Sequence, residues 1–167
     1  KKFKLVLADV AKVAPNQLLM TQQSQSMMQT LRRLGSGTVA LYTVLADNKG
    51  WVILTTPDFR RAYPINTTNL NKLVSDFRLT LKNDHYDPVP ISQTLYRALF
   101  LQKNDEGATL AADLKAYNAR TLMWSLDGVL RYVPIGALHD GSGYLIEKYS
   151  TLVFTIESLT RLLDSPD

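Results

Sequence analysis

The sequence of 167 residues contains no cysteine. This excludes disulfide bonds, thiolate metal sites and a cysteine nucleophile within the chain itself. The composition is compatible with a reducing compartment, and we expect a cytoplasmic protein. An uninterrupted apolar run of about 18 residues is also missing, so the sequence predicts no membrane-spanning helix and no membrane partner.

Histidine is scarce, since the sequence holds only His85 and His139. His85 lies in a polar Asn-Asp-His-Tyr-Asp stretch and is predicted to be an exposed loop residue. His139 precedes Asp140-Gly141, and we expect it to cap or decorate a turn. A metal site needs several ligands at close spacing, and no glycine-rich phosphate loop occurs, so no metal and no cofactor are predicted.

Acidic residues are few at the beginning of the chain. The formal net charge is +4, but residues 1–34 carry +5 and residues 35–167 carry −1. A nucleic-acid surface requires a basic stripe on the folded body, so we predict no nucleic-acid partner. Residues 1–34 are interpreted as a helical N-terminal arm, either solvated or facing a partner.

Hydrophobic patterns predict the elements of the first half. A helix rich in Gln, Met and Leu ends at Gly35, and β-formers then alternate with turn residues in a hairpin or meander. Trp51 is expected to be buried in this hairpin. A single apolar stripe next predicts a helix. In chain order, the expected elements are helix 18–34, strands 38–46, 51–56 and 61–65, and helix 70–81.

The second half is predicted to alternate between helices and strands. Two helices precede an apolar run after residue 121, which suits the central strand of a mainly parallel sheet and should bury Trp124. The expected elements are helices 91–101 and 110–117, strands 122–126, 129–133, 144–149 and 152–156, and a helix beginning at residue 159. Strands 122–126 and 152–156 are apolar on both faces, so we expect the chain to be half of a sheet, completed from elsewhere.

Asp127 is the acid of greatest interest, because it follows the predicted central strand. Ligands of open α/β sheets bind at the carboxyl ends of strands. Asp-Gly is also a common turn, so this position has a structural explanation as well. Serine offers no alternative nucleophile, since no Gly-x-Ser-x-Gly elbow occurs.

Residues 122–149 resemble the CHAT domain, a caspase-like and separase-like family that is often fused to tetratricopeptide repeats. The resemblance rests on Asp-Gly at 127–128, Leu-Arg-Tyr-Val-Pro-Ile-Gly-Ala-Leu at 130–138 and Gly-Tyr-Leu-Ile-Glu-Lys-Tyr at 143–149. The order of the predicted helices and strands is also similar to that of the family, and this looser resemblance covers residues 30–163.

The resemblance implies an α/β fold in which residues 35–167 form the first part of a caspase-like three-layer α/β/α sandwich, incomplete at its C-terminal end. The family's catalytic histidine and cysteine lie on later strands, so no catalytic residue is expected in this chain. Asp127, Arg131, His139 and Asp140 are the candidates for the wall of a substrate cleft. The implied partners are the missing half or a partner chain, a protein substrate and a tetratricopeptide-type recognition module.

Two functions follow from this reading. The first is the N-terminal, non-catalytic portion of a caspase-like cysteine peptidase of the CHAT family, bacterial by family habit. The alternative is a non-catalytic protein-interaction module. That module would be either a degenerate member of the same family or an unrelated α/β domain whose basic N-terminal helix contacts a partner.

Overall fold

The computed structural model describes residues 18–155 and residue 158. The expectations for residues 1–17 and for a helix beginning at Leu159 therefore lie outside the described residues. The described elements are α2 (Leu18–Leu34), β1 (Thr38–Ala46), β2 (Lys49–Thr55), β3 (Arg60–Pro64), α3 (Leu70–Leu81), α4 (Val89–Phe100), α5 (Leu110–Ala116), β4 (Thr121–Ser125), the 3-10 helices η2 (Gly128–Tyr132) and η3 (Ile135–Ala137), α6 (Leu145–Lys148) and β5 (Ser150–Val153).

The strands form one mixed sheet in the order β3-β2-β1-β4-β5. The first three make the predicted antiparallel meander, with Tyr42 of β1 opposite Ile53 of β2. β4 runs parallel to β1, with Trp124 opposite Leu41, and β5 runs parallel to β4. The carboxyl ends of β1, β4 and β5 therefore lie at the same edge of the sheet.

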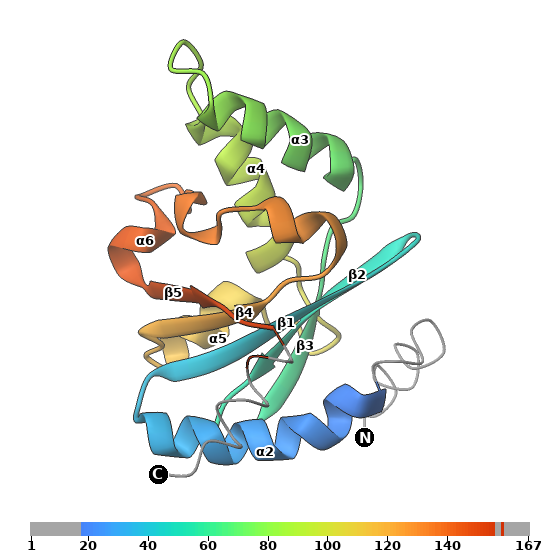
Figure 1. Ribbon diagram of the computed structural model, residues 1–167, viewed down its shortest axis with the longest axis vertical. Coiled ribbons are helices and arrows are strands. Elements are labelled where there is room, and N and C mark those ends of the chain that lie inside the picture. Colours follow the sequence, from blue (N-terminus) through green and yellow to red (C-terminus); the bar gives the residue numbers. More distant parts are fainter. Residues whose placement is uncertain (1–17, 156–157, 159–167) are drawn as a thin grey trace.

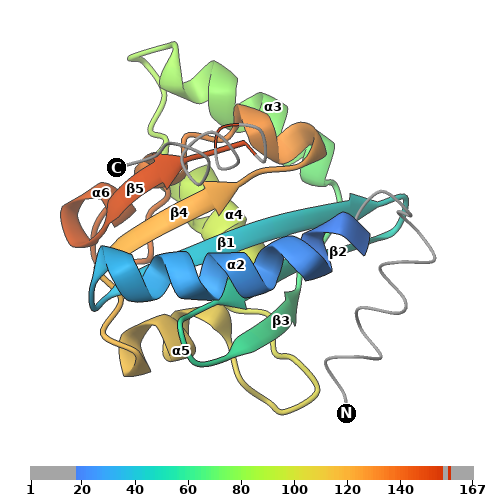
Figure 2. The ribbon, with the colours of Figure 1, turned by 60° about the horizontal axis from the view of Figure 1, so that its bottom comes forward.

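Helices cover both faces of this sheet, so the predicted α/β class is confirmed (Figure 1). α2 lies along one face, as Figure 2 shows from a second direction. α3, α4 and α5 lie on the opposite face, together with the segment that follows β4. Helices can pack on both faces because the central strands carry apolar side chains on both sides.

Strict alternation along the strands builds two hydrophobic layers. Val39 and Leu41 of β1 and Trp124 of β4 join the core under α3, α4 and α5. Tyr42 of β1 and Met123 of β4 point to the opposite core, under α2. Adjacent residues in a strand face opposite sides of a sheet, so one run of apolar residues supplies both layers.

The sequence predicts that both tryptophans are buried, but the structure buries them to different extents. Trp124 has no exposed surface, which confirms its placement in a central strand, and its ring lies 5.8 Å from that of Phe100. Trp51 is only half-buried, because it belongs to the β1–β2 hairpin on the side covered by a single helix. The prediction of a buried Trp51 is therefore too strong.

The strand predicted at 129–133 is wrong, since this segment is the 3-10 helix η2. The side chain of Asp127 accepts a hydrogen bond from the backbone nitrogen of Gly128, which has a φ of 52°, and this starts the turn. Leu130 and Val133 are buried at a spacing of three, which is the period of a 3-10 helix. In a strand, two residues three apart would point to opposite faces.

The strand predicted at 144–149 is also wrong. α6 occupies Leu145–Lys148, and the backbone nitrogen of Tyr149 donates to the Leu145 carbonyl, as in an α-helical turn. Leu145 is buried, whereas Ile146 is 69% exposed. The apolar run is thus too short for its spacing to separate a helical turn from a strand.

The last predicted strand is present but displaced, since β5 covers Ser150–Val153 rather than residues 152–156. Leu152 is 54% exposed and Val153 is 67% exposed, as expected for an apolar strand that the chain itself does not cover. Among the described residues, β5 forms an outer edge of the sheet. As neighbours in a strand, the two side chains point to opposite faces of the sheet, so each face has an exposed apolar side chain at that edge.

Candidate functional site

The site predicted from sequence lies where β1 and β4 end together. Asp127 follows β4, and one of its carboxylate oxygens accepts a hydrogen bond from the backbone nitrogen of Leu45 at 3.0 Å. The other oxygen accepts from the Gly128 nitrogen at 2.9 Å. The Asp127 nitrogen donates to the hydroxyl of Thr43, which donates in turn to the carbonyl of Ser125.

These contacts give Asp127 a structural task. Both carboxylate oxygens accept from backbone amides, which tie the end of β4 to the end of β1. One hydrogen bond from a backbone amide reaches each of the two oxygens, so the side chain is held against the backbone. Asp127 is therefore at the expected edge, but it holds the two strand ends in register rather than projecting a free acid.

An open cleft of about 480 Å³ lies beside this strand end. Its polar lining consists of Asp47, in the turn after β1, and of Thr67, Asn69 and Asn71 at the start of α3. Asn69 adopts a φ of 54°, and its side chain makes no capping hydrogen bond to the helix. The lining carries one carboxylate but no cation and no imidazole, so it offers hydrogen bonding rather than proton transfer.

Arg131 lies on η2, with an exposed side chain. Its Nε donates to the Leu126 carbonyl at 3.2 Å, which anchors the side chain near the end of β4. The terminal guanidinium nitrogens have no hydrogen-bond or ion-pair partner among the described residues. Arg131 is thus the one sequence-predicted candidate whose charge is still available to a ligand.

His139 lies in the connection between η3 and α6, and it does cap a turn. Its Nδ1 accepts a hydrogen bond from the Gly141 nitrogen at 3.0 Å and lies 3.3 Å from the amide nitrogen of Gln93 on α4. The edge of its ring meets Tyr144 at a centroid distance of 5.0 Å. With Nδ1 used as an acceptor, the imidazole positions the turn, and no serine hydroxyl hydrogen-bonds to it among the described residues.

Asp140 organises the same turn. Its Oδ1 accepts from the backbone nitrogens of Ser142 and Gly143 at 2.8 and 3.1 Å, and its Oδ2 pairs with Lys148 of α6. Burial raises the pKa of Asp140, but the hydrogen bonds from Lys148, Ser142 and Gly143 outweigh it and hold the pKa at about 2. The carboxylate is therefore ionised at neutral pH and committed to the turn.

The four candidates thus fall into two pairs with separate contacts. Asp127 and Arg131 bond to the ends of β1 and β4, whereas His139 and Asp140 bond within their own turn and to α4 and α6. A nucleophile and a base within hydrogen-bond reach are needed for covalent catalysis. Neither pair supplies that arrangement.

The sequence does not predict the contact that Ser92 makes inside α4, whose N-cap is Pro88. Ser92 is completely buried within α4, and its hydroxyl donates to the Ala137 carbonyl of η3 at 2.8 Å. The hydrogen bond therefore fastens the segment after β4 to the helix layer. Its only sequence signal is a small polar residue on a helix face that is otherwise apolar, which is typical of a buried hydroxyl with a specific partner.

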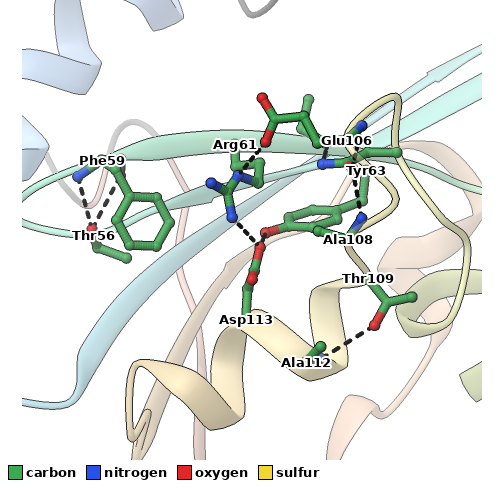
Figure 3. A network of polar contacts seen from close by, with 11 residues as sticks. Thr56, Phe59, Arg61, Tyr63, Glu106, Ala108, Thr109, Ala112 and Asp113 are labelled. Carbon is green, nitrogen blue, oxygen red and sulfur yellow. Dashed lines mark hydrogen bonds and ion pairs between the residues drawn. The ribbon is translucent and has the colours of Figure 1, made fainter.

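A second group of polar side chains, which the sequence did not predict, lies at the β3 edge of the sheet (Figure 3). Asp113 of α5 accepts a hydrogen bond from the hydroxyl of Tyr63 and forms an ion pair with Arg61 at 2.7 Å, both from β3. Arg61 also pairs with Glu106 at 3.3 Å. Burial raises the pKa of the Tyr63 hydroxyl most, and the hydrogen bond to Asp113 raises it further. The hydroxyl therefore keeps its proton. The group joins β3 to α5.

Residues 18–155 and 158 contain no cluster of three or more His, Cys, Asp or Glu side chains able to hold a metal ion. Within the same part of the chain, no helix combines the length and the apolar character needed to cross a membrane.

The fold and the strand-end site define a mixed α/β protein with a parallel core. In a comparison with known protein families, the model of the CHAT domain matches residues 89–167 of this chain. The resemblance to the CHAT domain is thus confirmed over this stretch, which runs from α4 through β4 and β5. No curated protein matches the chain.

Proposed function

We propose that this chain is the N-terminal, non-catalytic portion of a caspase-like cysteine peptidase of the CHAT family. It contributes core strands and one wall of the substrate cleft, while the nucleophile and the base belong to the remaining half of the domain. One observation carries the proposal: the parallel strands β1, β4 and β5 end at one edge, and the last of them presents Leu152 and Val153 uncovered.

The chemistry of such a peptidase fits this division. A thiolate attacks the peptide carbonyl, an imidazole moves the proton, and backbone amides stabilise the oxyanion. The sequence contains no cysteine, and His139 is committed to a turn. What this chain offers instead is a rigid strand end, fixed by Asp127, with the exposed Arg131 beside it.

The proposed partners follow from the same reading. The remaining strands would come from the missing half of the domain or from a partner chain, and would pair along β5. A protein would be the substrate, and a tetratricopeptide-type module would recognise the activating signal. We place the whole protein in the bacterial cytoplasm.

The test compares this chain with the complete product of its gene. Both are incubated with a thiol-directed covalent probe and with unfolded protein substrates. We expect labelling and cleavage only for the complete product, and loss of both after its labelled cysteine is changed to alanine. The 167-residue chain should be inactive, and His139→Ala in the complete product should leave the rate within about threefold, an effect of about 0.6 kcal/mol.

Two results would contradict the proposal. One is turnover by the 167-residue chain that His139→Ala abolishes. The other is a complete product that contains no reactive cysteine. The second result would favour the alternative, a non-catalytic interaction module built on the same fold.

A further inference from the structure

A basic groove lies between the last turn of α3 and the 3-10 helix η2. It has a volume of about 400 Å³ and opens to solvent. Arg78 of α3 and Lys82, which caps the end of α3, line it on one side, and Arg131 of η2 lines it on the other. The lining contains no acidic residue, so three cations share one hollow without a carboxylate among them.

None of these three cations forms an ion pair with another described residue. Arg78 lies over the ring of Tyr132, with its guanidinium carbon 4.9 Å from the ring centroid. Arg131 uses only its Nε in a hydrogen bond. The hydrogen-bonding faces of both guanidinium groups thus remain available.

Helix stability alone does not explain this arrangement. Cations near the carboxyl end of a helix are favourable, which accounts for Arg78 and Lys82 individually. However, like charges four residues apart repel each other, and Arg131 brings a third charge from another element. An anion bound among the three would remove this repulsion.

The rest of the groove is apolar. Leu81, Val133 and Pro134 line it beside Tyr132. Leu81 is 42% exposed and Tyr132 is 59% exposed, so an aliphatic side chain and an aromatic platform face the solvent next to the cations. Such a mixed surface fits a ligand that alternates carboxylates with apolar side chains.

We propose that this groove binds an acidic linear segment of a partner protein. Arginine binds carboxylates through paired N–H donors, and the apolar side chains of the segment would pack on Leu81 and Tyr132. Nucleic acid fits less well, because it requires a longer basic stripe, whereas residues 35–167 carry a formal charge of −1. This proposal does not depend on peptidase activity.

The test measures fluorescence anisotropy of labelled probes on the 167-residue chain. The main probe is a peptide of about twelve residues in which Glu alternates with Leu and Pro, a length that spans a groove of this kind. A peptide with Gln in place of Glu and a single-stranded oligonucleotide of equal length are the comparison probes. We expect the Glu peptide to bind with a Kd of about 100 μM or tighter, and more tightly than either comparison probe.

Charge-reversal variants locate the binding. Arg78→Glu and Arg131→Glu should each weaken binding of the Glu peptide about tenfold. Arg33→Glu is the matched control, because Arg33 lies in the last turn of α2 as Arg78 lies in the last turn of α3, and it should leave binding unchanged. Circular dichroism confirms that each variant is folded.

A second pair of variants separates the ring from the charges. Tyr132→Ala should weaken binding severalfold, whereas Tyr132→Phe, which keeps the ring, should not. The proposal is overturned if the Glu peptide does not bind, if the oligonucleotide binds more tightly, or if Arg33→Glu weakens binding as much as Arg78→Glu.

Discussion

Individual carboxylates in this protein serve as acceptors for backbone amides and hydroxyl groups that come from distant positions. Asp127 accepts from Leu45, which is 82 residues earlier, and Asp113 accepts from Tyr63, which is 50 residues earlier. In each case the side chain fixes one element against another. Hydrogen bonds to charged groups are stronger than neutral ones, so these few residues weigh on stability.

The Tyr63–Asp113 contact can be tested by removing one oxygen atom. Tyr63→Phe keeps the buried ring but deletes the hydroxyl that donates to the largely buried Asp113. We expect a loss of about 1–2 kcal/mol in the free energy of unfolding, measured by urea denaturation. Tyr86→Phe is the control, because Tyr86 is 65% exposed and its substitution should cost less than about 0.5 kcal/mol. Equal effects of the two changes would contradict the role given to Tyr63.

Asp140 predicts a dependence of stability on pH. Its pKa is lowered from 3.8 to about 2 in the folded chain, so folding favours the ionised form. The stabilisation is therefore present above pH 3.8 and is lost as the pH falls toward 2. In acid unfolding followed by circular dichroism, Asp140→Asn should remove this part of the pH dependence. Asp84→Asn, at a side chain that is 97% exposed, should leave it unchanged.

The elements differ in how well the sequence defines them. β1 and α3 match their predicted bounds, because β1 is a run of nine residues rich in β-formers and α3 carries one continuous apolar stripe. η2 and α6 were predicted as strands, because each offers only two or three apolar residues. In such short segments the tertiary contacts decide the conformation, here the Asp127 cap and the burial of Leu145.

The candidate site, too, could be predicted only in part from the sequence. The position of Asp127 at a strand end could be predicted from the apolar run before it. Its role could not, because the partners of its side chain and backbone, Leu45 and Thr43, lie on β1. The groove that contains Arg131 was likewise hidden, because α3 and its C-cap supply Arg78 and Lys82 about fifty residues earlier in the sequence.

α2 provides a test at the level of an element. The sequence placed residues 1–34 in a separate arm, and the division at residue 34 remains a prediction. Met27 and Leu31 nevertheless have no exposed surface and pack in the core beneath the helix. The described part of this segment therefore covers one face of the sheet.

Leu31→Ala should lower the free energy of unfolding by about 2–4 kcal/mol, because it opens a cavity between α2 and the sheet. Leu34→Ala is the matched control on the same helix, since Leu34 is 55% exposed, and it should cost less than about 0.5 kcal/mol. Urea denaturation measures both. A negligible effect of Leu31→Ala would mean that α2 is an independent arm.

For the molecule as a whole, the two edges of the sheet differ in how well they are covered. At the β3 edge, the group formed by Arg61, Tyr63 and Asp113 links the outermost strand, β3, to α5. On the β5 side, Leu152 and Val153 are largely exposed. An edge strand with uncovered apolar side chains is a template for pairing with another strand. This asymmetry marks β5 as the place where a further strand would join.

We therefore expect the 167-residue chain to associate with itself through β5 when no other strand is present. Light scattering should show a mean mass that rises with protein concentration. Replacing Leu152 and Val153 together by lysine should restore a monomer without unfolding, because β5 is only four residues long and lysine disfavours edge pairing. Leu79→Lys on α3 is the control, since Leu79 is equally exposed at 63% but lies on a helix away from the sheet edge, and its association should match that of the unaltered chain. If the unaltered chain is a compact monomer at all concentrations, β5 is not an open edge in solution, and the half-domain interpretation fails in favour of a self-contained interaction module.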